Sequence, residues 1–265
     1  MITNFVYDGR SLADFGYLLV IEGEEDTVNI SNIEYDTIKS ARNDRSYNVG
    51  YKYDENYSRT YFIMKNLCND PEDEFLTDYD ISELMRWLCR KQYKWLKFVD
   101  EDNMGADDEI WYQAYFTAEK EYVGEHVIGL RLTVHTNAPY GFTRLKRKEF
   151  TDTYFTLNVN TDEEGYIYPD VTIQVGTPGT LQFINTTENR ITELKNCVRD
   201  EIIVLSGYDI QEISSTNTNH DYITEFNYKF PRLFYEYNNG INKFSVNLYS
   251  KVTMEYREIR KVGLK

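Results

Sequence analysis

Only one stretch of this 265-residue chain has the periodicity of an amphipathic helix, which limits the folds it can adopt. The stretch lies near residues 80–91, where the apolar residues have the i, i+3, i+4, i+7 spacing of one helix face: Ile81, Leu84, Met85 and Leu88. Asp80, followed three residues later by Glu83, predicts the N-cap of this helix. The remaining sequence alternates or carries turn residues, and its 24 tyrosines favour strands. We therefore predict a mainly β protein.

The part of the chain up to Phe142 reads as an N-terminal α+β domain, residues 1–142. Short strands surround the helix, including a pair joined by a turn at Asp8-Gly9, and the stretch "HVIGLRLTVHT" closes the domain. Alternation in that last strand places His135 on the face opposite Leu132 and Val134. The strand ends at Pro139, because proline cannot donate to a sheet ladder.

The second half of the sequence has a different pattern of residues. Residues 143–153 are basic and lack clear periodicity, so we interpret them as a linker. Short strands and turns then follow to the end of the chain, and Val246–Tyr256 is expected to be the longest strand. Asn239-Gly240 predicts a two-residue hairpin turn with positive φ at both positions. This pattern indicates an all-β sandwich or jelly roll over residues 154–265.

The charge of the chain is strongly acidic and unevenly placed. The net charge is −15; residues 1–142 hold 27 acidic and 14 basic residues, a balance of −13, and the remainder holds 17 and 15, a balance of −2. Such a chain is not expected to bind nucleic acid or an anionic membrane specifically. No apolar run approaches the roughly 20 residues of a membrane span, and no signal peptide is recognisable, so we expect no membrane insertion.

No motif in the sequence nominates a catalytic residue, a cofactor site or a metal site. The three cysteines have no metal-ligand spacing and are interpreted as reduced packing residues: Cys68, Cys89 and Cys197. The three histidines also lack a second ligand at such spacing: His126, His135 and His220. The acidic loop from Asp100 matches positions 1, 3 and 6 of a calcium loop, but Met104 and Trp111 occupy positions 5 and 12. We expect a solvated hairpin tip there.

One run invites comparison with a sugar-binding motif. Galactose-binding lectins use His-x-Asn-Pro-Arg, whereas here Ala138 interrupts the run and Tyr140 stands in place of arginine. All three tryptophans lie before residue 142, so a sugar site in the C-terminal sandwich would stack on tyrosines: Tyr166, Tyr168 and Tyr208. A carbohydrate-binding module acting in host adhesion is therefore one alternative function. An enzyme acting on cell-wall polymers is another, although no carboxylate pair is singled out.

The order of parts resembles the distal tail protein (Dit) family of long-tailed, siphovirus-type bacteriophages. The resemblance rests on the early strand pair, the helix ending in "WL", the "KFVD" strand, the acidic hairpin and the exit "TNAPYGF". It implies a galectin-like C-terminal domain and a non-enzymatic virion protein, made in the host cytoplasm and placed at the distal end of the tail. The implied assembly is a homo-hexameric ring, a hub that joins the tail tube protein to the tail-tip protein and the receptor-binding protein.

The resemblance suggests a role for two further features of the sequence. The tyrosine-rich segment Arg45–Tyr57 becomes a candidate oligomer interface, with a loosely covered surface loop as the alternative; its tyrosines are Tyr47, Tyr51, Tyr53 and Tyr57. The acidic N-terminal domain, repeated six times around a channel, would repel the phosphates of passing DNA.

Overall fold

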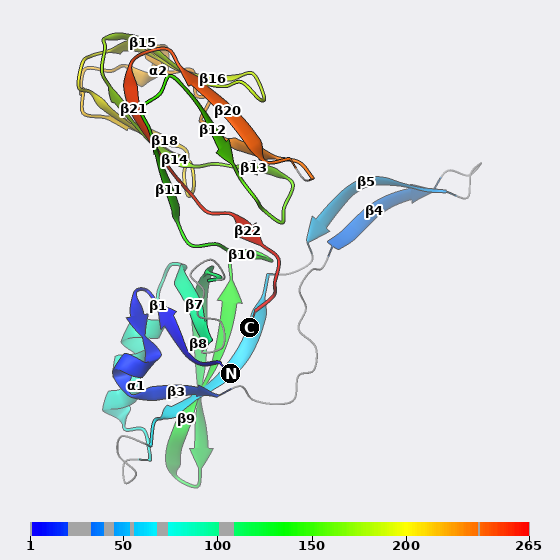
Figure 1. Cartoon of the computed structure of the whole chain (residues 1–265). Helices are drawn as coiled ribbons and strands as arrows, with labels where there is room; N and C mark the ends of the chain where they lie inside the picture. The colour runs from blue at the N-terminus through cyan, green and yellow to red at the C-terminus, as the bar shows by residue number, and fades with distance from the viewer. Residues whose placement is uncertain are drawn as a thin grey trace. The chain divides into compact units, whose positions relative to one another are not determined.

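The computed structural model describes residues 2–20, 33–39, 45–53, 56–67, 74–100, 109–237 and 239–264, with Tyr53 and Asp100 described by their backbone alone. The chain divides into two compact units, which are drawn in Figure 1. Unit 1 comprises residues 1–142 together with 260–265, and unit 2 comprises residues 143–259. Strands dominate both units, which confirms the predicted mainly β class.

Unit 1 is built on a seven-stranded antiparallel sheet in the order β2-β1-β7-β8-β9-β6-β3. Two further strands, β4 and β5, pair only with each other among the described residues, and β10 pairs with β22. The elements are β1 (Ile2–Tyr7), β2 (Arg10–Ser11), the 3-10 helix η1 (Leu12–Phe15), β3 (Tyr17–Val20), β4 (Ile33–Lys39), β5 (Ser46–Tyr53), β6 (Ser58–Lys65), α1 (Asp78–Leu88), β7 (Lys94–Asp100), β8 (Tyr112–Val123), β9 (His126–Thr136) and β10 (Gly141–Phe142). Strand β22 (Ile259–Arg260) spans the boundary, since Ile259 is the last residue of unit 2.

Helix α1 confirms the predicted helix but begins two residues earlier. Its N-cap is Thr77 rather than Asp80: the Thr77 hydroxyl accepts from the Asp80 backbone N–H, and the Asp80 carboxylate accepts from the Thr77 backbone N–H at 2.9 Å. The prediction of a capping box was therefore right, but the box begins at Thr77, about one turn before the predicted N-cap. The helix buries its apolar face in the core of unit 1, where the Trp87 indole also donates to the Tyr7 carbonyl.

Removing this cap is expected to weaken unit 1. Burial acts to raise the pKa of Asp80, but hydrogen bonds from Thr77 and Lys65 outweigh it and lower that pKa below its usual range. Substituting Thr77→Ala should cost about 1 kcal/mol of unfolding free energy. Tryptophan fluorescence reports on unit 1 alone, because all three tryptophans lie in it, and denaturant titration with this probe measures the change. An unchanged midpoint would contradict the assigned cap.

The last residues of the chain belong to unit 1, although the sequence placed them in the C-terminal domain. Leu264 is buried in the core of unit 1, and the Gly263 carbonyl accepts from the Tyr112 hydroxyl at 2.5 Å. The Gly263 backbone N–H donates to the Tyr57 hydroxyl at 3.3 Å. The chain therefore leaves unit 1 after Phe142 and returns to it after Ile259.

Because the end of the chain packs in unit 1, a substitution at Leu264 is expected to change the stability of unit 1. Substituting Leu264→Ala should destabilise unit 1 by about 2–3 kcal/mol, because it removes a buried side chain and leaves a cavity. Leu145, which is 47% exposed, supplies the matched Leu→Ala control with little expected effect. Tryptophan fluorescence during denaturation would show the shift, and equal behaviour of the two variants would contradict the packing of the C-terminal segment.

Unit 2 is a two-sheet sandwich with a five-stranded sheet, β11-β21-β14-β17-β18, and a four-stranded sheet, β12-β20-β15-β16. Strands β13 and β19 form a third, two-stranded ladder. The elements are β11 (Lys146–Phe150), β12 (Tyr154–Asn158), β13 (Gly165–Ile167), β14 (Asp170–Val175), β15 (Gly179–Asn185), β16 (Arg190–Cys197), β17 (Ile202–Ser206), β18 (Glu212–Ser215), α2 (Tyr222–Glu225), β19 (Leu233–Tyr235), β20 (Ile241–Val246) and β21 (Ser250–Tyr256).

Alternating residues from both sheets of unit 2 enter one core, as expected for a sandwich. In β21, for example, Val252, Met254 and Tyr256 are buried while the residues between them are less covered. Residues 143–153, which were expected to be a linker, contain strand β11, and this strand pairs along its length with β21. Its basic side chains lie on an outer strand, where Arg147 is paired with Glu149 and Glu255.

Two local predictions in unit 2 were wrong. The long strand predicted over Val246–Tyr256 is two strands in different sheets, and Asn247 sits at the break with its side chain bonded to the backbone of β15. Asn239-Gly240 does not form the predicted hairpin turn, because neither residue has positive φ. Gly240 is instead needed for close approach: a Cβ there would lie 1.8 Å from the Val159 carbonyl oxygen.

Candidate functional site

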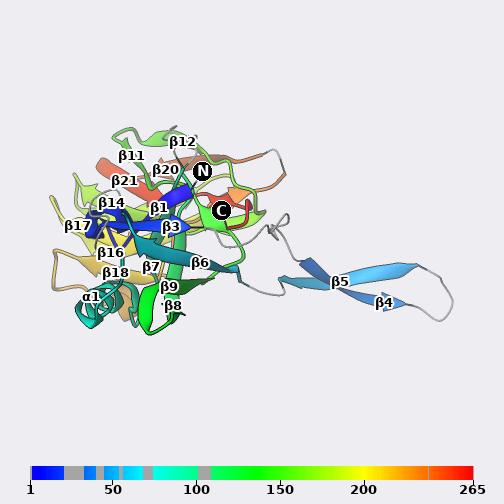
Figure 2. The same ribbon diagram turned by 90° about the horizontal axis from the view of Figure 1, so that it is seen from below.

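Strands β4 and β5 form a separate two-stranded ribbon, which we call the arm, residues 33–39 with 46–53 (Figure 2). Tyr35 lies opposite Tyr51, and Ile38 lies opposite Tyr47. The register shifts between Asp36 and Thr37, where Val49 of β5 is an extra residue without a partner on β4. Five large apolar side chains of the arm are more than half exposed: Tyr35, Ile38, Tyr47, Val49 and Tyr51. Ile33, at the start of β4, is partly covered.

The structure separates the four tyrosines proposed for an interface. Tyr47 and Tyr51 lie on the arm and are 52% and 56% exposed. Tyr57 is instead buried in the core of unit 1, where its hydroxyl accepts from Gly263. The side chain of Tyr53 lies outside the described residues. The arm also exposes Tyr35, Ile38 and Val49, which sequence reasoning did not single out.

The three tyrosines proposed for sugar contact come from neighbouring backbone in unit 2. Tyr166 is 47% exposed, and the Arg232 guanidinium lies 3.6 Å from its ring centroid. Arg232 also hydrogen-bonds Tyr168, and its charge is held by Glu188 at 2.6 Å. Tyr208 is half-buried and follows Gly207, where a Cβ would lie 3.1 Å from that of Tyr168. Arg232 therefore occupies one face of Tyr166, and the Phe234 ring lies 5.6 Å from the Tyr166 ring, centroid to centroid.

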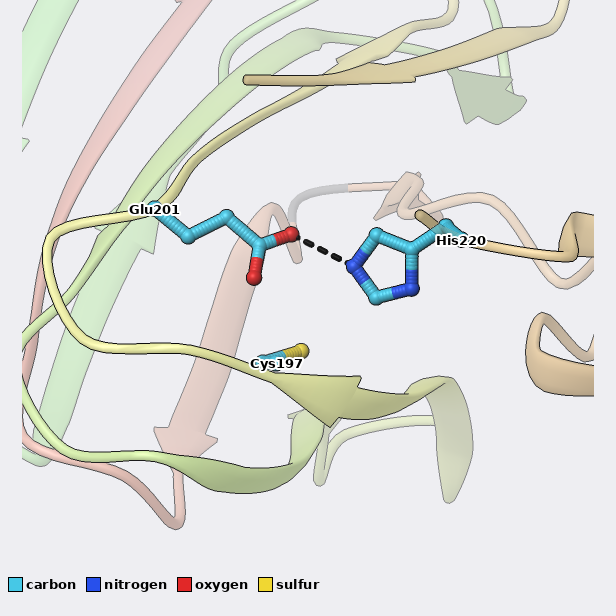
Figure 3. Close-up of side chains that lie close together, drawn as sticks. All are labelled: Cys197, Glu201 and His220. Atoms are coloured by element: carbon cyan, nitrogen blue, oxygen red, sulfur yellow. Dashed lines mark hydrogen bonds and ion pairs between the residues drawn. The ribbon is translucent and has the colours of Figure 1, made fainter. Parts of the chain in front are cut away.

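A buried cluster of donor atoms lies in unit 2, and no sequence motif pointed to it (Figure 3). The Cys197 thiol, the Glu201 carboxylate and the His220 imidazole each offer one atom, and these atoms all lie within 4.8 Å of one another. Cys197 ends β16, Glu201 immediately precedes β17, and His220 lies in the loop between β18 and α2. The side chains of Glu201 and His220 are 0% and 1% exposed.

Hydrogen bonds hold each member of this cluster in place. The Glu201 carboxylate accepts from the Val198 backbone N–H at 2.8 Å and from the Ser215 hydroxyl at 2.5 Å. His220 Nε2 lies 2.7 Å from Glu201 Oε1, and His220 Nδ1 lies 2.5 Å from Glu225 Oε2. Asn196 in turn donates to the other oxygen of Glu225. The cluster is therefore an ordered network.

The electrostatics of the cluster follow from burial and from these bonds. Burial acts to lower the pKa of His220, but its hydrogen bonds to Glu225 and Glu201 outweigh this and raise it above the ordinary value. A histidine with a carboxylate on each nitrogen donates from both only as the imidazolium. Burial raises the pKa of the Cys197 thiol to about 11. The protonated thiol donates a hydrogen bond to the Leu194 carbonyl.

Sequence reasoning missed this cluster because its spacing is unlike that of common metal motifs. Cys197 and Glu201 are joined by a tight turn in which Asp200 has positive φ, while His220 comes from a loop 19 residues further on. The packing interpretation holds for Cys197, which is buried, and is wrong for Cys89, which is exposed; Cys68 lies outside the described residues.

The sequence also singled out His135 and an acidic loop. The His135 side chain lies on the half-covered face of β9, stacked on Tyr115 and within 3.4 Å of the Ser58 and Thr117 hydroxyls. Its predicted orientation, away from buried Leu132 and Val134, is confirmed. The acidic loop compared with a calcium site, residues 101–108, lies outside the described residues. Among the helices that the structure describes, none is long and apolar enough to cross a membrane.

Comparison with known families assigns both halves of the chain. Residues 1–138 match the family described as phage tail protein N-terminal domain, and residues 140–256 match the one described as phage tail C-terminal domain. The chain belongs to the phage tail proteins. No curated protein sequence matches this phage tail protein.

The fold of this phage tail protein is similar to a solved structure over its full length. The crystal structure of SPP1 Dit (gp 19.1), described as a paradigm of the hub adsorption apparatus in phages that infect Gram-positive bacteria, superposes with a TM-score of 0.63. The match covers 97% of this chain and 99% of that chain, at 12% sequence identity. At that identity the match establishes a shared fold. It confirms the resemblance to distal tail proteins.

Proposed function

We propose that this phage tail protein is a hub of the tail tip. Six copies form a ring through unit 1, and the ring joins the tail tube protein to the tail-tip protein and the receptor-binding protein. The full-length likeness to SPP1 Dit supports this placement. The protein acts as a structural component of the virion, without catalysis, at the distal end of the tail.

The observation that carries the proposal is the arm. An isolated two-stranded ribbon is marginally stable in water, and this one exposes five large apolar side chains. Tyrosine and other large apolar residues are enriched at the buried centres of protein interfaces. A neighbouring subunit that covers the arm explains both its composition and its persistence as a ribbon. The proposed interface therefore consists of the exposed arm residues Tyr35, Ile38, Tyr47, Val49 and Tyr51. It no longer includes Tyr57, which is buried.

The charge of unit 1 fits a ring through which DNA passes. The return of residues 260–265 adds three basic residues to the 14 of residues 1–142, so unit 1 carries 27 acidic and 17 basic residues, a balance of −10. Six copies concentrate this charge around the channel, where it repels phosphate and lets the genome slide. A structure of the ring with basic residues lining the channel would overturn this part of the proposal.

Negative-stain microscopy of the purified full-length protein tests the hub directly. Closed six-fold rings are the expected result. Single chains at every concentration, or rings with another copy number, would contradict the proposed assembly.

A second candidate function is carbohydrate binding by unit 2 in host adhesion. Exposed Tyr166 beside Arg232 favours it, because sugars stack on an aromatic face and arginine donates to hydroxyl groups. A glycan array probed with the full-length protein and with a Tyr166→Ala variant tests this function. Binding that the substitution abolishes would support it, and the absence of binding to any host cell-wall glycan would remove it.

A further inference from the structure

We propose that Cys197, Glu201 and His220 bind one Zn²⁺ ion, which fastens the β16–β17 turn to the loop between β18 and α2. This site is independent of the ring and of sugar binding. It lies entirely within unit 2, on residues that neither proposed function uses.

The donor set is one that zinc prefers. Cysteine sulfur, histidine nitrogen and carboxylate oxygen are its ordinary protein ligands, and a thiolate among them disfavours magnesium and calcium. Zinc bonds of about 2.0–2.3 Å place tetrahedral donor atoms roughly 3.3–3.7 Å apart. The three donor atoms already lie within 4.8 Å of one another, and the pair formed by His220 and Glu201 needs to open from 2.7 Å by only about half an ångström.

The hydrogen bonds around the cluster orient the ligands toward a common point. Glu225 binds Nδ1 of His220, so Nε2 is the nitrogen that faces Glu201 and Cys197 (Figure 3). A carboxylate on the far nitrogen of a metal-binding histidine is a recurring arrangement at zinc sites, where it fixes the ring and raises its basicity. Val198 and Ser215 hold the Glu201 carboxylate in the same way. The supporting contacts of a metal site are thus present around His220 and Glu201.

A bound divalent cation changes the protonation of its ligands. Zinc takes the place of the proton on His220 Nε2, and its charge removes the proton from the Cys197 thiol despite the burial of that group. Both protons leave to solvent. Glu201, held by two hydrogen bonds, turns from an ion-pair partner of His220 into a ligand of the metal.

Burial decides the role of the ion. Catalytic zinc sites have three protein ligands and an accessible fourth position for water and substrate. Here the side chains of Glu201 and His220 are almost fully covered, and Cys197 is 3% exposed. A substrate therefore has no direct access to the metal, and the ion serves to hold two loops of the sandwich together.

Cobalt titration tests the site. Full-length protein is stripped with a chelator under reducing conditions and titrated with Co²⁺, which gives a near-ultraviolet thiolate-to-cobalt charge-transfer band when a cysteine binds it. We expect the band to saturate at one ion per chain and to disappear on addition of one equivalent of Zn²⁺. Cys197→Ser should abolish the band, and Glu225→Gln should weaken zinc binding about 10–100-fold.

The matched control is a Cys68→Ser, Cys89→Ser double variant, which removes the other cysteines and should keep the full band. Circular dichroism checks that Cys197→Ser still folds, and cobalt titration of His220→Gln, with His126→Gln as its control, provides a second disruption. No band in the wild-type chain, or a band that survives Cys197→Ser, would overturn the proposal and leave the cluster as a metal-free ion-pair network. Ring formation is measured separately, so failure here leaves the hub proposal intact.

Discussion

Replacing the exposed apolar residues of the arm with serine is expected to abolish the ring while leaving a folded chain. The triple substitution Tyr35→Ser, Tyr47→Ser, Tyr51→Ser removes side chains that are 58%, 52% and 56% exposed, so the fold of the chain loses little. If two of them are interface hot spots worth about 2 kcal/mol each, association weakens roughly 1,000-fold. Sedimentation velocity across a concentration series measures the loss.

The control for this experiment is built from tyrosines elsewhere in unit 1. Tyr79 on α1 and Tyr122 on β8 are 74% and 55% exposed, and Tyr79→Ser, Tyr122→Ser should leave assembly unchanged. Deleting Ser46–Glu55 gives a coarser version of the same test and should yield folded monomers. Rings that persist in the arm variants at wild-type concentration would show that subunits meet elsewhere.

Substituting Asn242→Ala is expected to be among the most damaging single changes in unit 2. Asn242 is fully buried, and its amide donates to the carbonyls of Phe234 and Gly240. Its oxygen accepts from the Phe234 backbone N–H and from the Asn185 side chain. Because alanine leaves four buried or half-buried polar groups without this partner, we expect a loss of about 3–5 kcal/mol.

Amide hydrogen exchange locates this loss. Peptides from β12, β19 and β20 should lose protection in Asn242→Ala, whereas the tryptophan fluorescence transition of unit 1 should not move. Asn219, an exposed asparagine in the same unit, supplies the matched Asn→Ala control. Protection that matches the wild type in β19 would mean that Asn242 does not anchor that strand.

Sequence reasoning recovered the elements whose signals are local. The helix, the alternation of β9 and the turn at Asp8-Gly9 each depend on neighbours in the chain, and the structure confirms them; both turn residues have positive φ. The errors arise where contacts between segments far apart in the sequence determine the structure. The Val246–Tyr256 pattern is continuous in sequence, yet Asn247 bonds to β15 and the strand breaks there to change sheets. Leu264 is apolar and terminal, and only the fold reveals that it packs in unit 1.

The candidate sites divide in the same way. The tyrosine-rich arm was visible because its composition is unusual over a short stretch, but the burial of Tyr57 depends on residues about 200 positions away. The cluster of Cys197, Glu201 and His220 had no motif, because a turn and a long loop bring its members together. Folded geometry alone places the Glu225 carboxylate on the far nitrogen of His220.

The central claim is that this phage tail protein forms a six-membered ring through its arm. Native mass spectrometry of the full-length protein, run beside the triple arm variant, tests this most directly. The account predicts a complex of six 31.5 kDa chains for the wild type and single chains for the variant. A wild-type protein that stays a single chain at high concentration, or a variant that assembles equally well, would contradict it.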